Sequence, residues 1–225
     1  DSIYTLFTDR EDVIWIGTNR GVSRFDRLGP FQQTVSDIPN SNFVRTLFKA
    51  AGGRVYAGTN RGLFAQDGEK WTPVPAYTNK PIYAVSEDRS GKLLVGTTER
   101  INYPPSRLSM DADTRSYADF QGGKFAAVFG VGLVQIGAGG NTIRHEDESV
   151  NTLFASEDKL WIGTAGKGLF SFDGRSVKAE ASPDVLKSGA IWRIFESSDN
   201  AIWIAGEHGV FRQKDARVEK VIDAG

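Results

Sequence analysis

The chain contains no cysteine, which excludes disulfide bonds, thiolate metal sites and a cysteine nucleophile. It also lacks an excess of either charge, because 27 basic and 28 acidic residues give a formal net charge of −1. No basic field is therefore available to neutralise the phosphates of a nucleic acid. We expect no nucleic-acid partner.

Long hydrophobic runs are lacking as well. The longest, FAAVFGVGLV at 125–134, has ten residues, whereas a helix that crosses a bilayer needs about 20. We expect a soluble segment without membrane contact. The sequence opens at Asp1 rather than at methionine, so we expect a processed or excised piece, with any signal peptide or membrane anchor of the parent outside it.

Glycine, in contrast, is abundant, with 25 residues, and it recurs in a repeated phrase. Residues 14–26 read IWIGTNRGVSRFD and residues 160–173 read LWIGTAGKGLFSFD. The glycines of all such phrases are Gly17, Gly58, Gly96, Gly137, Gly163 and Gly206. Their successive spacings are 41, 38, 41, 26 and 43 residues, and a period near ~40 residues is typical of β-propeller blades.

Each repeat is predicted to hold a first strand, a second strand that ends on IGT or a variant, a glycine turn and a third strand. Short apolar and β-branched runs between turn residues favour strands over helices. The predicted fold is an all-β propeller of six blades, at about 1–41, 42–79, 80–123, 124–148, 149–189 and 190–225. An incomplete part of a seven-bladed ring is the alternative.

The fourth repeat is predicted to be a shortened blade of two or three strands, because only 26 residues separate Gly137 from Gly163. Its first strand is expected at KFAAVF, 124–129. The third repeat carries a polar insertion at 102–123, in which Pro104 and Pro105 are expected to break any strand.

The repeated phrase resembles the two-component regulator propeller repeat, D-x-x-G-x-LWIGT-x-x-GL-x-RFDG. Residues 11–26 and 157–174 match it best. This family occurs in large extracytoplasmic sensor regions of bacterial hybrid histidine kinases and related sensors. The resemblance implies a periplasmic or extracellular sensor or interaction module, with glycan-derived ligands the usual ones. The family's repeat is structural and implies no catalytic residue.

One position varies while its neighbours recur. The third residue of each predicted first strand is Tyr4, Arg45, Tyr83, Ala126, Asn151 and Trp192. A position that only builds the fold should be alike in near-copies, so the aromatic and polar members are predicted to line a pocket that stacks on a sugar or small planar ligand. The alternative is that they fill the top of the channel as packing.

The turns after the second strands are predicted to share the rim of that pocket. They contain Arg20, Arg61, Arg100 and His208. Arginines in equivalent turns could bind carboxylate or phosphate with a forked geometry. The alternative is that the recurring TNRG is a polar turn copied by duplication.

No cofactor and no metal site are predicted. His145 lies in RHEDE, 144–148, which lacks the spacing of a metal motif and is expected to be a solvated turn. Calcium bound by Asp111, Asp113 and Asp119 would lack the loop glycine and the final glutamate of a hand-type site.

The leading hypothesis is therefore a non-catalytic ligand-recognition propeller whose partner is a small molecule or an oligosaccharide. A protein-interaction scaffold is the first alternative, with the partner docked on 102–123 or on an open edge beside the short fourth blade. The second is a polysaccharide lyase or hydrolase that uses Tyr4, Arg45, Tyr83 and His208.

Overall fold

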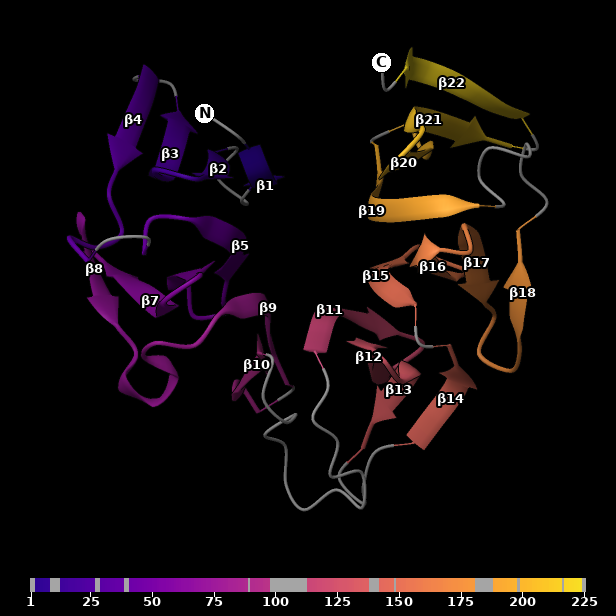
Figure 1. The fold of residues 1–225 in the computed structure, drawn as a ribbon, viewed down its shortest axis with the longest axis horizontal. Helices are drawn as coiled ribbons and strands as arrows, with labels where there is room; N and C mark the ends of the chain where they lie inside the picture. Colours follow the sequence, from indigo (N-terminus) through magenta and orange to yellow (C-terminus); the bar gives the residue numbers. More distant parts are fainter. Residues whose placement is uncertain are drawn as a thin grey trace. The chain divides into compact units, whose positions relative to one another are not determined.

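The computed structural model of the chain is built from antiparallel sheets of short strands (Figure 1). The structure describes residues 3–8, 13–26, 29–38, 41–88, 90–97, 113–137, 142–147, 149–180, 188–197, 199–215 and 217–223. The chain forms two compact units, an N-terminal unit, Asp1–Tyr103, and a C-terminal unit, Pro104–Gly225. The predicted all-β class is confirmed. Within the described ranges, no helix is long and apolar enough to cross a membrane.

The described residues of the N-terminal unit form three sheets of consecutive strands. The first sheet is β1 (Ile3–Thr8), β2 (Ile14–Thr18), β3 (Gly21–Asp26) and β4 (Gly29–Gln33). The second is β5 (Val44–Lys49), β6 (Val55–Thr59), β7 (Gly62–Asp67) and β8 (Lys70–Pro73). A 3-10 turn, η1 (Pro75–Tyr77), leads to the third, which pairs β9 (Ile82–Glu87) with β10 (Leu93–Thr97).

The C-terminal unit contains three sets of four strands. The first set is β11 (Asp113–Phe120), β12 (Gly123–Phe129), β13 (Gly132–Ile136) and β14 (Thr142–Glu146). The second is β15 (Val150–Ala155), β16 (Leu160–Gly166), β17 (Leu169–Phe172) and β18 (Val177–Ala179). The third is β19 (Gly189–Glu196), β20 (Ile202–Gly206), β21 (Gly209–Lys214) and β22 (Arg217–Asp223). The end of β16 pairs with the start of β19, which joins the last two sets.

The prediction for the fourth repeat is wrong. Residues 113–120, expected to lie in a polar insertion, form β11, the first strand of a full four-stranded sheet. KFAAVF is therefore part of the second strand, β12, and the fourth repeat is not shortened to two or three strands. Strand β11 contains no apolar run that would predict a strand from the sequence. It is held instead by its ladder to β12 and by the buried ring of Phe120. Pro104 and Pro105 lie outside the described residues.

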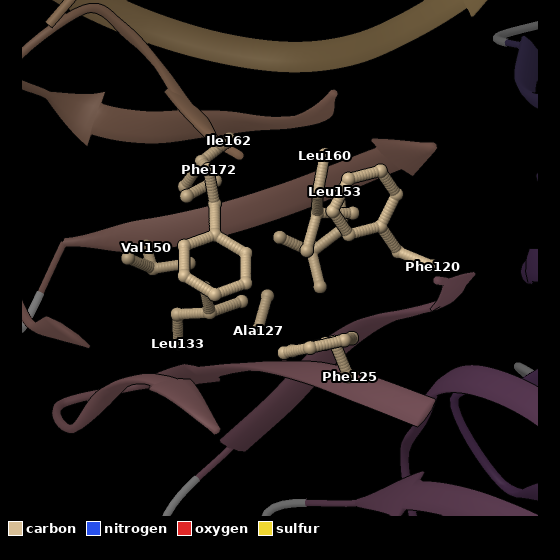
Figure 2. Close-up of a cluster of buried hydrophobic side chains, with 9 residues drawn as sticks. All are labelled: Phe120, Phe125, Ala127, Leu133, Val150, Leu153, Leu160, Ile162 and Phe172. Atoms are coloured by element: carbon tan, nitrogen blue, oxygen red, sulfur yellow. The ribbon is translucent and has the colours of Figure 1, made fainter. Parts of the chain in front are cut away.

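Consecutive sheets of each unit pack face to face through apolar clusters. Between the strands of β11–β14 and those of β15–β18, Phe120, Phe125, Leu133, Leu153 and Phe172 are buried together with smaller aliphatic side chains (Figure 2). Trp15 and Trp161 take part in two other clusters of this kind, each with residues of the following sheet. At these two positions the tryptophan of the repeated phrase packs one repeat on the next, whereas Trp203 is half-buried. Burial of such apolar area is the main term that stabilises each unit.

The glycine of the IGT phrase is required by a close approach between sheets. A Cβ atom at Gly58 would lie 2.6 Å from Thr46 Cγ2 and 2.7 Å from Ile82 Cγ2 of the following sheet. At Gly163 it would meet Ile191 Cγ2 at 2.7 Å in the same way. Neither glycine has a positive φ. The phrase recurs where a repeat receives the first strand of the next one against this bare backbone.

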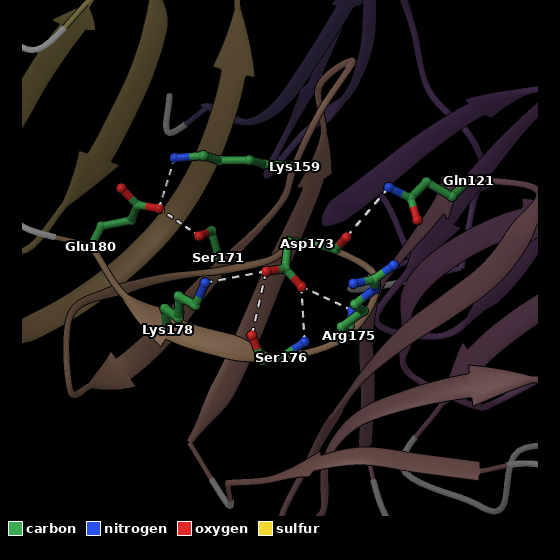
Figure 3. A network of polar contacts seen from close by, with 8 residues as sticks. All are labelled: Gln121, Lys159, Ser171, Asp173, Arg175, Ser176, Lys178 and Glu180. Carbon is green, nitrogen blue, oxygen red and sulfur yellow. Dashed lines mark hydrogen bonds and ion pairs between the residues drawn. The ribbon is translucent and has the colours of Figure 1, made fainter.

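The turn between β17 and β18 contains the Asp–Gly pair 173–174 and is closed by the aspartate. Asp173 accepts hydrogen bonds from the backbone N–H groups of Ser176 and Arg175, and these bonds hold the pKa of its carboxyl well below the ordinary value (Figure 3). The carbonyl oxygen of Asp173 accepts a bond from Gln121 of the β11–β12 turn. The turn therefore also ties two neighbouring sheets together.

Asp147 makes a second polar link in the C-terminal unit, between β14 and β15. Its buried carboxylate accepts bonds from Ser149 N at 2.9 Å, Ser149 Oγ at 2.6 Å and Lys167 Nζ at 3.1 Å. Burial acts to raise the pKa of Asp147, but these hydrogen bonds and the Lys167 charge outweigh it and leave the pKa below the ordinary value. Residues 144–146 lie in β14 and Asp147 is buried, so the expectation of a solvated turn at RHEDE is wrong for these positions.

The packing at Gly58 predicts a large cost for a single added carbon. Gly58→Ala should destabilise the protein by about 1–3 kcal/mol, because the new Cβ overlaps two side chains that are themselves packed. The measurement is urea unfolding followed by tryptophan fluorescence. Gly52→Ala is the control, since a Cβ there meets nothing within 4 Å. Equal stability of the two variants would contradict the close-approach account.

The Asp147 site predicts a pH dependence. Its pKa is lower in the folded than in the unfolded chain, so its stabilisation is complete above the unfolded value of about 4 and is lost as the pH falls below it. Asp147→Asn should cost about 1–2 kcal/mol at neutral pH and progressively less below pH ~4. Unfolding free energies of both proteins from pH 7 to 3 provide the test. Asp119→Asn, at an exposed ion pair, is the control, and a cost that does not change with pH would refute the assignment.

Candidate functional site

The variable position found in the sequence is a β-bulge. In six first strands, pairing with the second strand skips one residue at the same place. The skipped residues are Tyr4, Arg45, Tyr83, Arg115, Asn151 and Trp192. A bulge leaves its residue outside the ladder and re-aims its side chain. We call these six the bulge residues; because strand pairing does not constrain them, their variability has a structural cause.

Five bulge residues agree with the predicted column, and the fourth repeat differs. There the bulge residue is Arg115, not Ala126, because β11 rather than 124–129 is the first strand. Ala126 is fully buried in β12. The triplet Thr114–Arg115–Ser116 is similar to Val44–Arg45–Thr46, and this similarity was the signal that could have identified β11 in the sequence.

The N-terminal unit brings three bulge residues together. The guanidinium carbon of Arg45 lies 5.0 Å from the ring centre of Tyr83 and 4.9 Å from that of Phe43. The ring of Phe43 in turn lies 4.2 Å from that of Tyr4. We call Tyr4, Phe43, Arg45 and Tyr83 the aromatic–arginine cluster. Phe43, which immediately precedes β5, was not predicted, because it belongs to the apolar pattern of the strand rather than to the variable position.

Arg45 is fixed in place by a hydrogen bond as well as by the rings. Its Nε donates to Asn60 Oδ1 at 2.6 Å. Asn60 sits in the β6–β7 turn, which the buried Thr59 closes by donating its hydroxyl to Gly62 O at 3.0 Å. Two ring contacts and one bond at Nε hold the planar guanidinium in place.

The rim arginines belong to the same type of turn. Arg61 N donates to Thr59 Oγ1 and Arg20 N donates to Thr18 Oγ1, so both turns are closed through the threonine of the IGT phrase. The side chains of Arg20 and Arg61 are exposed at the tips. Arg100 lies outside the described residues. The recurrence of TNRG thus has a structural reason in the threonine and glycine, while Asn60 has an additional role in holding Arg45.

In the C-terminal unit the bulge residues have separate surroundings. Asn151 Nδ2 donates to Ile191 O at 2.9 Å, which ties β15 to β19. The bulge residue Trp192, which follows Ile191 in β19, is 52% exposed. His208 lies against the backbone of Gly189, where a Cβ would come within 2.6 Å of its Nε2. Arg115 pairs with Asp113 at 2.8 Å and lies over Phe129. The amide of Asn151 is thus used in packing, whereas the indole of Trp192 is displayed.

A hollow of about 670 Å³ lies elsewhere in the C-terminal unit. It is lined by residues of the β15–β16 and β19–β20 turns, including Lys159, Trp161 and Glu196. These turns are at the opposite end of the strands from the bulges. Trp161 Nε1 donates to Ser156 Oγ, and the hollow is lined mainly by charged and polar side chains of these turns.

The calcium idea does not fit the structure. Asp113 and Asp119 lie near opposite ends of β11, about 20 Å apart by the rise of a strand. Asp113 pairs with Arg115 and Asp119 with Lys124, and Asp111 lies outside the described residues. Across the described part of the chain, no group of three or more His, Asp or Glu side chains is placed to hold a metal ion.

Comparison with solved structures shows that the fold is a β-propeller. The extracellular domain of the putative hybrid two component system BT4673 from B. thetaiotaomicron superposes with a TM-score of 0.79 at 16% identity, over 98% of this chain and 33% of that one. The β-propeller domain of Cps50 (Swd1) from Myceliophteria thermophila gives 0.70 at 12% identity, over 99% of this chain and 87% of that one. The chain spans about a third of the length of the first of these proteins.

The resemblance in the repeated phrase is confirmed by a family comparison. The family model described as two component regulator propeller matches residues 1–20. A second structure of the B. thetaiotaomicron BT4673 domain, there called a putative one component system, has a TM-score of 0.74 at 18% identity, over 99% of this chain and 36% of that one. No curated protein matches the chain in sequence.

Proposed function

We propose that the chain is a non-catalytic ligand-recognition propeller that works outside the cytoplasm, as the input region of a two-component type of regulator. The aromatic–arginine cluster of the N-terminal unit is the binding site in this proposal. Its ligand is a glycan-derived or other small molecule.

The observation that carries the proposal is the convergence of Tyr4, Arg45 and Tyr83. They come from three different sheets, each as the residue that the ladder leaves out. Aromatic and guanidinium groups assembled in this way, with Tyr4 38% exposed, provide stacking surfaces and directed donors. A site that only filled space would need no ordered arginine between two rings.

The comparisons support the location and the type of function. The similar BT4673 domain is the extracellular domain of a putative hybrid two component system, and the family that matches residues 1–20 is a two component regulator propeller. These relatives favour a function in which the propeller recognises a ligand outside the cell. The response would be produced elsewhere in a longer protein. The regulatory output is itself part of the proposal, since the chain spans about a third of that relative.

The test is a thermal-shift screen of the chain against neutral and acidic oligosaccharides, followed by calorimetry of the hits. A ligand that binds only the folded form raises the melting temperature. Tyr83→Ala should weaken binding of a hit by about tenfold or more through loss of the ring contact, and should cost less than about 2 kcal/mol of stability because the ring is only half-buried.

Phe31→Ala is the matched control, because Phe31 is an exposed ring of the same unit outside the cluster. It should leave binding unchanged. The proposal fails if no oligosaccharide binds, or if hits bind equally well to Tyr83→Ala. Conversion of a hit into shorter products during incubation would show a lyase or a hydrolase and refute the non-catalytic assignment.

A further inference from the structure

The geometry of the cluster also points to the charge of the ligand. We propose that the ligand is an acidic sugar, and that its carboxylate or sulfate is bound by the two terminal amino groups of Arg45. This inference rests on the proposed function, since it concerns the same site.

Arg45 retains hydrogen-bond donors that no described residue uses. A guanidinium carries five N–H groups in one plane. The single Nε–H is used by Asn60, and no described residue accepts a bond from Nη1 or Nη2. The four N–H groups of Nη1 and Nη2 are therefore available to a ligand, and two of them point side by side from the edge that joins Nη1 and Nη2. Two parallel N–H···O bonds to a carboxylate or sulfate are the arrangement that this edge fits best.

The two rings limit the space around the guanidinium of Arg45. Phe43 and Tyr83 each lie about 5 Å from the guanidinium carbon, at 4.9 and 5.0 Å. Ring contacts at this distance occupy part of the space around the guanidinium, and its terminal N–H groups are the groups left to bind a ligand. Apolar neighbours also lower the local dielectric, which strengthens a charge-assisted bond at these N–H groups. The partly exposed ring of Tyr4 is left to contact the body of the sugar.

The charge distribution at this end of the N-terminal unit favours an anion. The bulges, the β2–β3 and β6–β7 turns and the connections into β5 and β9 all lie at one end of the strands. Their described residues include the cations Arg20, Arg45, Arg61 and Lys80, and the single described carboxylate is Asp37. An excess of positive charge around a site attracts anionic ligands and raises their association rate.

Asn60 acts as a positioning residue in this account. Without its acceptor, the guanidinium could rotate between the rings and the terminal amino groups would lose their fixed direction. Its contribution should therefore appear only with ligands that carry the anionic group.

The experiment measures dissociation constants for pairs of oligosaccharides that differ only in charge. Galacturonate and glucuronate oligomers are compared with their methyl esters, and sulfated disaccharides with their desulfated forms, by calorimetry on the 225-residue chain. We expect the charged member of a binding pair to bind about 10- to 100-fold more tightly. The carboxylate and sulfate arms identify which of the two acids is the ligand.

Variants assign the preference to Arg45. Arg45→Gln should abolish the difference within a pair, and Arg45→Lys should recover little of it, because an ammonium group has no fork. Asn60→Ala leaves the charge of Arg45 unchanged. It should reduce the preference for the charged member of a pair, while the affinity for the uncharged member stays the same. Arg54→Gln, at an exposed position of the β5–β6 turn at the opposite end of the strands, is the control and should leave the preference in place.

Several outcomes would overturn the inference. Equal affinity for charged and uncharged members would do so, and so would a preference that survives both Arg45→Gln and Asn60→Ala. If uncharged members bind and Tyr83→Ala weakens them, the proposed function stands and only the acidic ligand is refuted. If no member of any pair binds, the proposed function fails and this inference fails with it.

Discussion

The contact between a glycine of one sheet and the first strand of the next is the constraint on which this structure depends. Gly17, Gly58 and Gly163 each meet a β-branched residue of the following sheet, at Val44, Ile82 and Ile191. At these three positions a side chain would overlap its neighbour, whereas the fourth and sixth repeats carry Ala127 and Ala205 at the equivalent place beside the bulge. The apolar clusters then form on both sides of this contact. IGT thus recurs because it forms an interface between repeats, not because it forms a chemical site.

The β-bulge next to this contact leaves one residue of each repeat unconstrained by strand pairing. The bulge in each first strand lies opposite the end of the second strand, beside the glycine or its equivalent, and leaves one residue without a ladder partner. Packing requires the glycine, the threonine and the apolar residues around it to stay alike. The bulge residue is free to vary, and its side chain can be aromatic, cationic or polar without cost to the sheet. In the N-terminal unit this freedom has produced an arginine held between two rings.

Much of this could be predicted from the sequence, because the repeat signals local structure. Strands such as β2 and β16, the Asp–Gly turns and five of the six bulge residues follow from periodicity and comparison of repeats. The strand β11 is not indicated by periodicity, since it is polar and is held by pairing with β12; only the similarity of its bulge triplet to Val44–Arg45–Thr46 points to it. The partnership of Arg45 with Asn60 was also hidden, because it joins a strand to a turn 15 residues away. Contacts of this kind depend on register, and an equivalent position in another repeat does not reproduce them.

Two tryptophans of the C-terminal unit allow the most direct test of the central claim, that recurring positions build the fold and bulge residues are displayed from it. Trp161 is a recurring residue, buried between two sheets, and Trp192 is a bulge residue that is 52% exposed. The measurement is the free energy of unfolding of Trp161→Ala and Trp192→Ala against the unchanged chain. The account predicts a loss of about 3–5 kcal/mol for Trp161→Ala and less than about 1 kcal/mol for Trp192→Ala. Similar losses for both would contradict it.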